Sequence, residues 1–123
     1  MPFIVSKVNI AVTLEQEQTL KERLGKAIEL VPGKSEKHLF LSFEDNCHFY
    51  LRGQNSRPLA YITASLFGNE DHGGFAAFSA EVTKNYRAVL GIAPEDCYIK
   101  FDDISSWAVG GKFMDRRMFR WQT

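Results

Sequence analysis

The proline that directly follows the initiator methionine is the residue of this chain whose chemistry depends most on its position. If Met1 is removed, the ring nitrogen of Pro2 becomes a secondary amine at the mouth of a strand, and such an amine can accept a proton. If Met1 is retained, Pro2 only precedes an edge strand beginning at Phe3, where a proline does little harm. The five residues 1–5 by themselves leave both interpretations open.

The cysteines and histidines of the sequence form no recognisable catalytic or metal-binding motif. Cys47 and Cys97 lie far apart and form no CxxC motif, so we expect reduced, buried thiols of a cytosolic protein. His38, His48 and His72 show no metal-ligand spacing, and each is best explained as a surface or core residue. The sequence therefore predicts neither a metal site nor a cofactor.

Length and composition narrow the possible classes of protein. A chain of 123 residues fits a single domain, 1–123, and a hydrophobic content of 45% is typical of globular proteins. Lys plus Arg and Asp plus Glu both number 15, so the formal net charge is zero. This balance argues against general binding of nucleic acid or anionic membranes, which needs a basic excess. No apolar run has transmembrane length, and near-neutral small proteins associate readily.

Two segments of the first half carry clear secondary-structure patterns. Residues 2–12 alternate as a strand. Thr13 and Gln16 then have the spacing of a capping box, and apolar residues recur with helical period from Leu14 until Pro32-Gly33 ends the helix. Further strands are expected at 38–43 and, after a turn, at 47–51.

The second half repeats these signals. Residues 59–66 are nearly all apolar and predict a central strand, and a glycine-rich turn at 68–74 precedes a helix at about 75–90, with Gly91 in the C′ position. A last core strand is expected at 98–101. Residues 105–123 contain Gly110-Gly111 and too many apolar side chains for a free tail, so we expect part of this segment to pack.

Strand, helix, turn and strand thus occur twice, at 3–43 and at 59–101. Each copy predicts a β-α-β unit with parallel strands. Two pseudo-repeated β-α-β units give an α/β (α+β) fold: a four-stranded mixed sheet with two helices on one face. Because the strands are apolar, we expect the uncovered face of the sheet to be buried against other subunits.

Four short motifs have a familiar order: Pro2 after Met1, Gly33-Lys34 after the first helix, the turn 65–68 (Ser-Leu-Phe-Gly), and Tyr98-Ile99. With these motifs the chain resembles the macrophage migration inhibitory factor and tautomerase superfamily over about residues 2–110. The resemblance implies a homotrimer in which three sheets form a barrel-like core, with the helices outside. This arrangement agrees with the uncovered sheet face.

The resemblance also implies a site between neighbouring subunits that needs no cofactor. Pro2 would be the general base, which moves a proton between carbon and oxygen of an α-keto acid such as phenylpyruvate. Lys34 would hold the substrate carboxylate, and the backbone around Phe67 would add a hydrogen bond. Tyr98 of the adjacent subunit would line the aromatic end of the pocket.

Physical chemistry is consistent with these roles. Burial of Pro2 among Phe3, Phe67 and Tyr98, with a lysine charge nearby, would disfavour the ammonium form and lower the pKa of the amine. A base whose pKa lies near the working pH is the useful one. Lys34 would offset the negative charge of the enolate.

Each of these residues also has a purely structural explanation. Lys34 could interact with the negative end of the preceding helix dipole. Tyr98 could be an ordinary strand aromatic, and Phe67 could simply fill a turn.

The chain departs from the family pattern at several positions. Residues 59–62 read Leu-Ala-Tyr-Ile where the well-studied member has a CxxC motif, so we expect no thiol oxidoreductase activity. Lys100 replaces an asparagine, and this second cation would favour a more anionic substrate or compete with Lys34 for the carboxylate. Phe67 replaces an aliphatic residue and would narrow the pocket. The extension at about 112–123 is longer and more basic than expected.

Together these observations predict an isomerase (an intramolecular oxidoreductase) of the phenylpyruvate tautomerase type, with Pro2 as catalytic residue and Lys34, Phe67, Tyr98 and Lys100 as substrate-binding residues. The alternative is a cytokine-like signalling or binding trimer with vestigial activity. We expect a cytoplasmic protein, since the start of the chain does not resemble a signal peptide. The resemblance leaves leaderless secretion open, and the sequence identifies no receptor.

Overall fold

The computed structural model describes residues 2–120, with side chains described as far as Met118. The elements are, in chain order, β1 (Pro2–Val8), α1 (Leu14–Ala27), β2 (Phe40–Glu44), β3 (Ala60–Phe67), α2 (Phe75–Leu90), β4 (Cys97–Ile104), β5 (Ser106–Val109), β6 (Lys112–Asp115) and α3 (Arg116–Arg120). Short 3-10 turns occupy Ile28–Leu30, Glu36–His38 and Pro94–Asp96.

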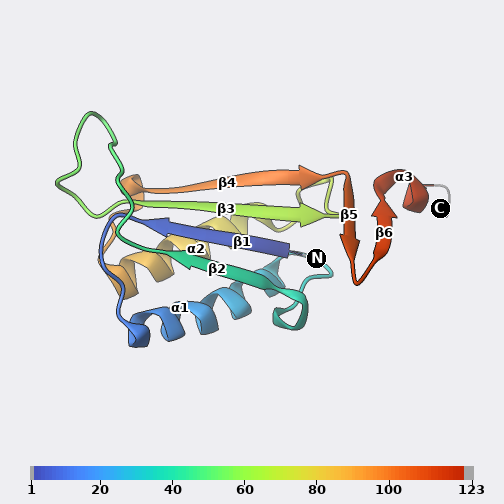
Figure 1. Ribbon diagram of the computed structural model, residues 1–123, viewed down its shortest axis with the longest axis horizontal. Helices are drawn as coiled ribbons and strands as arrows, with labels where there is room; N and C mark the ends of the chain where they lie inside the picture. Colours follow the sequence, from blue (N-terminus) through green and yellow to red (C-terminus); the bar gives the residue numbers. More distant parts are fainter. Residues whose placement is uncertain (1, 121–123) are drawn as a thin grey trace.

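The first four strands form one mixed sheet with the order β2-β1-β3-β4. β1 is parallel to β2 and β3 is parallel to β4, while β1 and β3 are antiparallel neighbours at the centre. Both long helices lie on the same face of this sheet (Figure 1). The expected pair of β-α-β units and the four-stranded mixed sheet are therefore confirmed.

Local interactions explain where α1 begins and where α2 ends. The hydroxyl of Thr13 accepts a hydrogen bond from the backbone N–H of Gln16 (3.1 Å), and the side-chain oxygen of Gln16 accepts one from the N–H of Thr13 (2.9 Å), so the capping box is confirmed. α2 ends at Leu90, and Gly91 follows with φ of 69°, a conformation that glycine adopts without strain.

The hydrophobic core lies between the sheet and the two helices. Side chains alternate along the central strands, so that Ile4, Ser6 and Val8 of β1 are buried while their neighbours are more exposed. The buried apolar cluster comprises Ile4, Val8, Leu20, Leu24, Ala27, Ile28, Val31, Ala60, Ile62, Ala64, Leu66, Phe75, Phe78, Val82, Tyr86, Leu90 and Ile92.

The sheet face opposite the helices is less apolar than the strand sequences suggested. On β3 it carries Tyr61, Thr63 and Ser65, which alternate with the buried residues of that strand. The same alternation places Lys7 of β1 on this face, where its ammonium group lies 3.8 Å from a carboxylate oxygen of Glu44. The apolar content of the strands is thus largely explained by the core, and the open face is mixed in character.

The prediction of a strand at 47–51 is wrong. This segment belongs to a loop in which Leu51 and Gln54 form only an isolated antiparallel bridge. Between them Arg52 and Gly53 have φ of 54° and 76°, the left-handed values of a tight two-residue turn. Asn46 also has a positive φ (55°), so the chain leaves the extended conformation before the segment begins.

The C-terminal segment folds back as a hairpin. β5 and β6 pair in antiparallel register across Gly110 and Gly111, whose φ values are 59° and 79°. Two positive φ values at the centre of a two-residue loop match the twist of the flanking strands. The glycine pair was the sequence signal for this hairpin, which the sequence analysis described only as a packed segment.

The two cysteines are free and partly buried, so neither is as fully buried as expected. Burial raises the pKa of the Cys97 thiol to about 11, and a hydrogen bond involving Thr83 opposes this shift. At neutral pH Cys97 is therefore a protonated, unreactive thiol. Within residues 2–120, no helix is both long and apolar enough to cross a membrane.

A buried hydrogen bond ties α2 to the centre of the sheet and yields a prediction for stability. The hydroxyl of Tyr86 donates to the Ser6 hydroxyl oxygen at 2.6 Å, and the two residues are 0% and 3% exposed. Burial also raises the pKa of Tyr86, so the phenol stays neutral. We expect Tyr86→Phe to lower the free energy of unfolding by about 1–2 kcal/mol, because the Ser6 hydroxyl loses its donor.

Urea unfolding measures this effect, and a double-mutant cycle with Ser6→Ala provides the control. We expect the double variant Tyr86→Phe/Ser6→Ala to be less destabilised than the sum of the single variants, because neither polar partner then remains buried alone. Strict additivity would show that the two hydroxyls do not interact.

Candidate active site

Pro2 is the first residue of β1 and is buried. It lies opposite Leu66 of β3 in the antiparallel register, at the edge of an open groove of about 740 Å³. The groove is lined by Pro2, Phe3, Lys37, His38, Leu39, Phe40, Leu41, Trp107, Ala108 and Val109. The strand therefore holds the proline in a fixed place beside a space large enough for a small ligand.

Lys34 reaches toward the same end of the sheet. Its backbone N–H donates to the carbonyl of Val31 (3.1 Å), and its ammonium group donates to the backbone carbonyl of Phe67 at 2.7 Å. Phe67 directly follows Leu66, the register partner of Pro2. Lys34, Phe67 and Pro2 are thus brought together, and the lysine contacts a strand carbonyl rather than the end of α1.

The ammonium group of a lysine has three N–H donors. Among the residues whose side chains are described, 2–118, the contact that the structure gives the Lys34 ammonium group uses one of them. The remaining donors can bind an anion without loss of the bond to Phe67, which in turn fixes the direction of the side chain.

The turn after β3 holds the segment that carries Lys34. The side-chain N–H of Asn69, a buried residue, donates to the backbone carbonyl of Pro32 at 3.0 Å. The backbone of Gly74 packs so closely on this segment that a Cβ atom there would lie 2.1 Å from the carbonyl oxygen of Leu30. The segment that leads into Lys34 is therefore in close contact with the turn between β3 and α2 of the second β-α-β unit.

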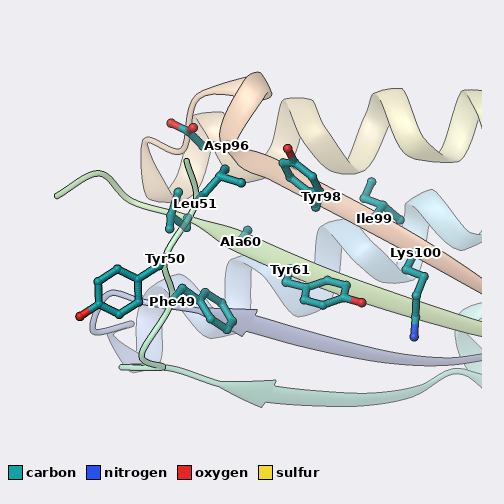
Figure 2. Close-up of a pocket in the computed structure, with 10 residues that line it drawn as sticks. Phe49, Tyr50, Leu51, Ala60, Tyr61, Asp96, Tyr98, Ile99 and Lys100 are labelled. Atoms are coloured by element: carbon teal, nitrogen blue, oxygen red, sulfur yellow. The ribbon is translucent and has the colours of Figure 1, made fainter. Parts of the chain in front are cut away.

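Tyr98 and Lys100 lie elsewhere in the chain's own fold. They line a second cavity, of about 380 Å³, over β3, β4 and the loop that precedes β3 (Figure 2). Tyr98 lies opposite Tyr61, five residues along β3 from Leu66, which corresponds to about 17 Å along the sheet. Neither Tyr98 nor Lys100 lines the groove beside Pro2 in a single copy of the chain.

This second cavity has an aromatic wall and one cation. Tyr61 and Tyr98 are 40% and 52% exposed, and Figure 2 shows them on neighbouring strands, with Phe49 contributed by the loop. The ammonium group of Lys100 lies 3.7 Å from a carboxylate oxygen of Asp102, so its charge is partly compensated. Sequence analysis missed Tyr61, although its alternation with buried Ala60 and Ile62 places it on the open face.

An ion-pair cluster anchors the loop that lines the second cavity. Asp96 is 1% exposed, and its carboxylate contacts the guanidinium group of Arg52, which lies in the loop. The Nε atom of Arg57 lies 2.8 Å from the other carboxylate oxygen without the alignment of a hydrogen bond. Both arginines are half exposed, so the loop attaches to the domain by a buried anion with two solvated cations.

Most residues that line the groove beside Pro2 were not selected by the sequence analysis, among them Lys37, His38, Phe40 and Trp107. Phe40 is 69% exposed, and its ring contacts that of Phe3 edge to face, with centroids 5.0 Å apart. The sequence does indicate that Phe40 is exposed, because Leu41 and Phe43 lie on the other face of the strand and pack on the core. The position of Trp107 could not be predicted from the sequence, because Trp107 reaches the groove only through the C-terminal hairpin.

The described residues contain no group of three or more His, Cys, Asp or Glu side chains that could hold a metal ion.

Comparison with solved structures identifies the fold of the chain. MIF2 of Leishmania major superposes with a TM-score of 0.83 at 18% identity, covering 93% of this chain and 97% of the other. The chain has the macrophage migration inhibitory factor (MIF) and tautomerase fold.

Two further structures with the MIF and tautomerase fold extend the comparison. Pt0534, solved after inactivation by 2-oxo-3-pentynoate, has a TM-score of 0.82 at 15% identity and covers 94% of this chain and 98% of its own. A fused 4-OT described as a wild-type asymmetric trimer has a TM-score of 0.80 at 17% identity, with coverage of 96% and 98%. No family sequence model matches the chain, and no curated protein matches it in sequence.

Proposed function

We propose that the protein is a cofactor-independent keto–enol tautomerase of 2-oxo acids related to phenylpyruvate, with Pro2 as the general base. The observation that carries this proposal is the convergence of Pro2, the Lys34 ammonium group and the Phe67 carbonyl at one end of the sheet, beside an open groove. The fold is supporting evidence, since Pt0534, a protein with this fold, was inactivated by the 2-oxo acid 2-oxo-3-pentynoate.

The proposed reaction needs one base and one anion-binding group. Once Met1 is removed, the secondary amine of Pro2 takes a proton from the carbon beside the keto group. The electron pair of the broken C–H bond forms the C=C bond, and the keto oxygen becomes an enolate oxygen that then accepts a proton. Lys34 holds the carboxylate and offsets the charge that develops in the enolate.

The same proposal assigns Tyr98 and Lys100 to the site through a second copy of the chain. Within one copy they line a different cavity from Pro2, so we assign their contribution to the contact between two copies. In the described sheet, the edge strands β2 and β4 each have one neighbouring strand, so each has a free edge for association. We therefore propose a homotrimer, and the fused 4-OT of the same fold is likewise described as a trimer.

Loss of the Lys34 charge tests the proposal. We expect Lys34→Met to lower kcat/KM for phenylpyruvate tautomerisation by about 10–100-fold, because a charge-assisted hydrogen bond to the carboxylate is lost. Lys34→Arg should retain more activity than Lys34→Met. Lys21→Met is the matched control, because Lys21 is an exposed lysine of α1 away from the groove.

The assay follows the absorbance of the enol in wild type, the two Lys34 variants and the control, after intact mass spectrometry has established that Met1 is absent. Equal rates for wild type and Lys34→Met would contradict the role of Lys34. Wild type with a free Pro2 amine and no activity toward any 2-oxo acid would contradict the enzymatic function and leave the binding-protein hypothesis.

A further inference from the structure

The groove beside Pro2 is cationic on one side. Lys37 is the one charged residue among the described residues that line it, and none of them is acidic. His38 follows directly, and both residues are exposed in the 3-10 turn Glu36–His38. This turn lies in the chain between Lys34 and β2.

Neither side chain has a partner among the side chains that the structure describes, which end at Met118. The structure gives no ion pair or hydrogen bond to the side chain of Lys37 or His38 in this part of the chain. Lys100, the second cation selected from the sequence, differs in this respect because Asp102 lies 3.7 Å from it. An anion that enters the groove would therefore meet an uncompensated charge at Lys37.

The groove that Lys37 lines also has aromatic walls. Phe3 and Phe40 form an edge-to-face pair, Phe40 is 69% exposed, and Trp107 faces the groove from β5. Flat side chains of this kind favour a flat, conjugated ligand. The groove thus combines the proposed base Pro2, aromatic side chains, and a cation beside an imidazole.

We propose that Lys37 and His38 bind a second anionic group of the substrate, so that the preferred substrate is an aromatic 2-oxo acid with a distal carboxylate. This inference rests on the proposed tautomerase function for its reactive end. Lys37 supplies the charge, and the imidazole of His38 supplies a hydrogen bond to the same group. They are specificity residues, and they take no part in the proton transfer.

A matched pair of substrates isolates the second charge. Phenylpyruvate and 4-carboxyphenylpyruvate undergo the same reaction and differ by one carboxylate. We expect wild type to prefer 4-carboxyphenylpyruvate by at least about 10-fold in kcat/KM, and Lys37→Met to reduce this preference by about 10-fold. Lys37→Arg should retain most of the preference, His38→Asn should reduce it less than Lys37→Met, and the exposed helix variant Lys84→Met should not change it.

A binding measurement separates this inference from the proposed function. The unreactive acids 3-phenylpropanoate and 3-(4-carboxyphenyl)propanoate carry the same two charge patterns, and NMR titration gives their Kd values without any proton transfer. If wild type binds both equally, or if Lys37→Met and Lys84→Met change the ratio of Kd values equally, the assignment of Lys37 is overturned. If the ratio falls only in Lys37→Met but neither keto acid is tautomerised, the anion site stands and the tautomerase function fails.

Discussion

Conversion of the Pro2 amine into an amide should lower kcat/KM for phenylpyruvate by at least about 10²-fold, the usual contribution of a general base. We predict this result for a variant with one alanine inserted between Met1 and Pro2. Processing of that chain exposes the alanine, while the proline ring, its fixed φ and its place opposite Leu66 are retained. Only the lone pair of the ring nitrogen is lost to the new peptide bond.

Pro2→Gly complements the insertion. This variant keeps a terminal amine but loses the ring, which makes the amine primary and frees its backbone. We expect kcat/KM to lie between those of wild type and the insertion variant. Circular dichroism and thermal unfolding should show intact folding in both cases, because β1 remains paired with β2 and β3. Wild-type activity in the insertion variant would exclude the Pro2 nitrogen as the base.

The sequence predicted those features of the fold that depend on local patterns. The capping box at Thr13, the bounds of α2 and the glycine at its end are set by residues within a few positions of one another. The repeated β-α-β order also followed, because hydrophobic period and turn residues suffice to identify it. The structure confirms these elements, with shifts of a few residues at strand ends.

The site was less accessible from the sequence because its contacts join distant parts of the chain. The bond from Lys34 to the Phe67 carbonyl spans 33 positions, and no local pattern encodes it. The resemblance suggested both residues, but only the fold brings them together. Phe40 and Trp107 enter the groove through strand register and the C-terminal hairpin, which were not predicted.

The close contact at Gly74 gives the largest expected effect on stability. Gly74 has φ of 79°, and a Cβ atom there would lie 2.1 Å from the Leu30 carbonyl oxygen and 3.1 Å from Cδ of Pro32. A backbone oxygen cannot rotate away as a side chain can, so the two segments must separate. We expect Gly74→Ala to lower the free energy of unfolding by at least about 3 kcal/mol, or to prevent folding.

Gly91→Ala separates the two causes of this loss, which are the positive φ of the glycine and the contact of its new Cβ atom with the backbone. Gly91 has a similar φ of 69°, but nothing lies within 4 Å of the position its Cβ would take. We expect about 1 kcal/mol from the backbone conformation alone, measured by urea unfolding. Equal losses in the two variants would show that the contact with Leu30 is unimportant.

The same comparison connects the fold to the proposed function. Since Leu30 and Pro32 lead into Lys34, separation of the segments at Gly74 should displace the ammonium group from the Phe67 carbonyl. Where Gly74→Ala still folds, we therefore expect a higher KM for phenylpyruvate at a temperature well below its Tm. Gly91→Ala should keep the wild-type KM, because the end of α2 has no such connection to Lys34. A normal KM in folded Gly74→Ala would show that Lys34 is positioned by its own turn and not by the contact between the two units.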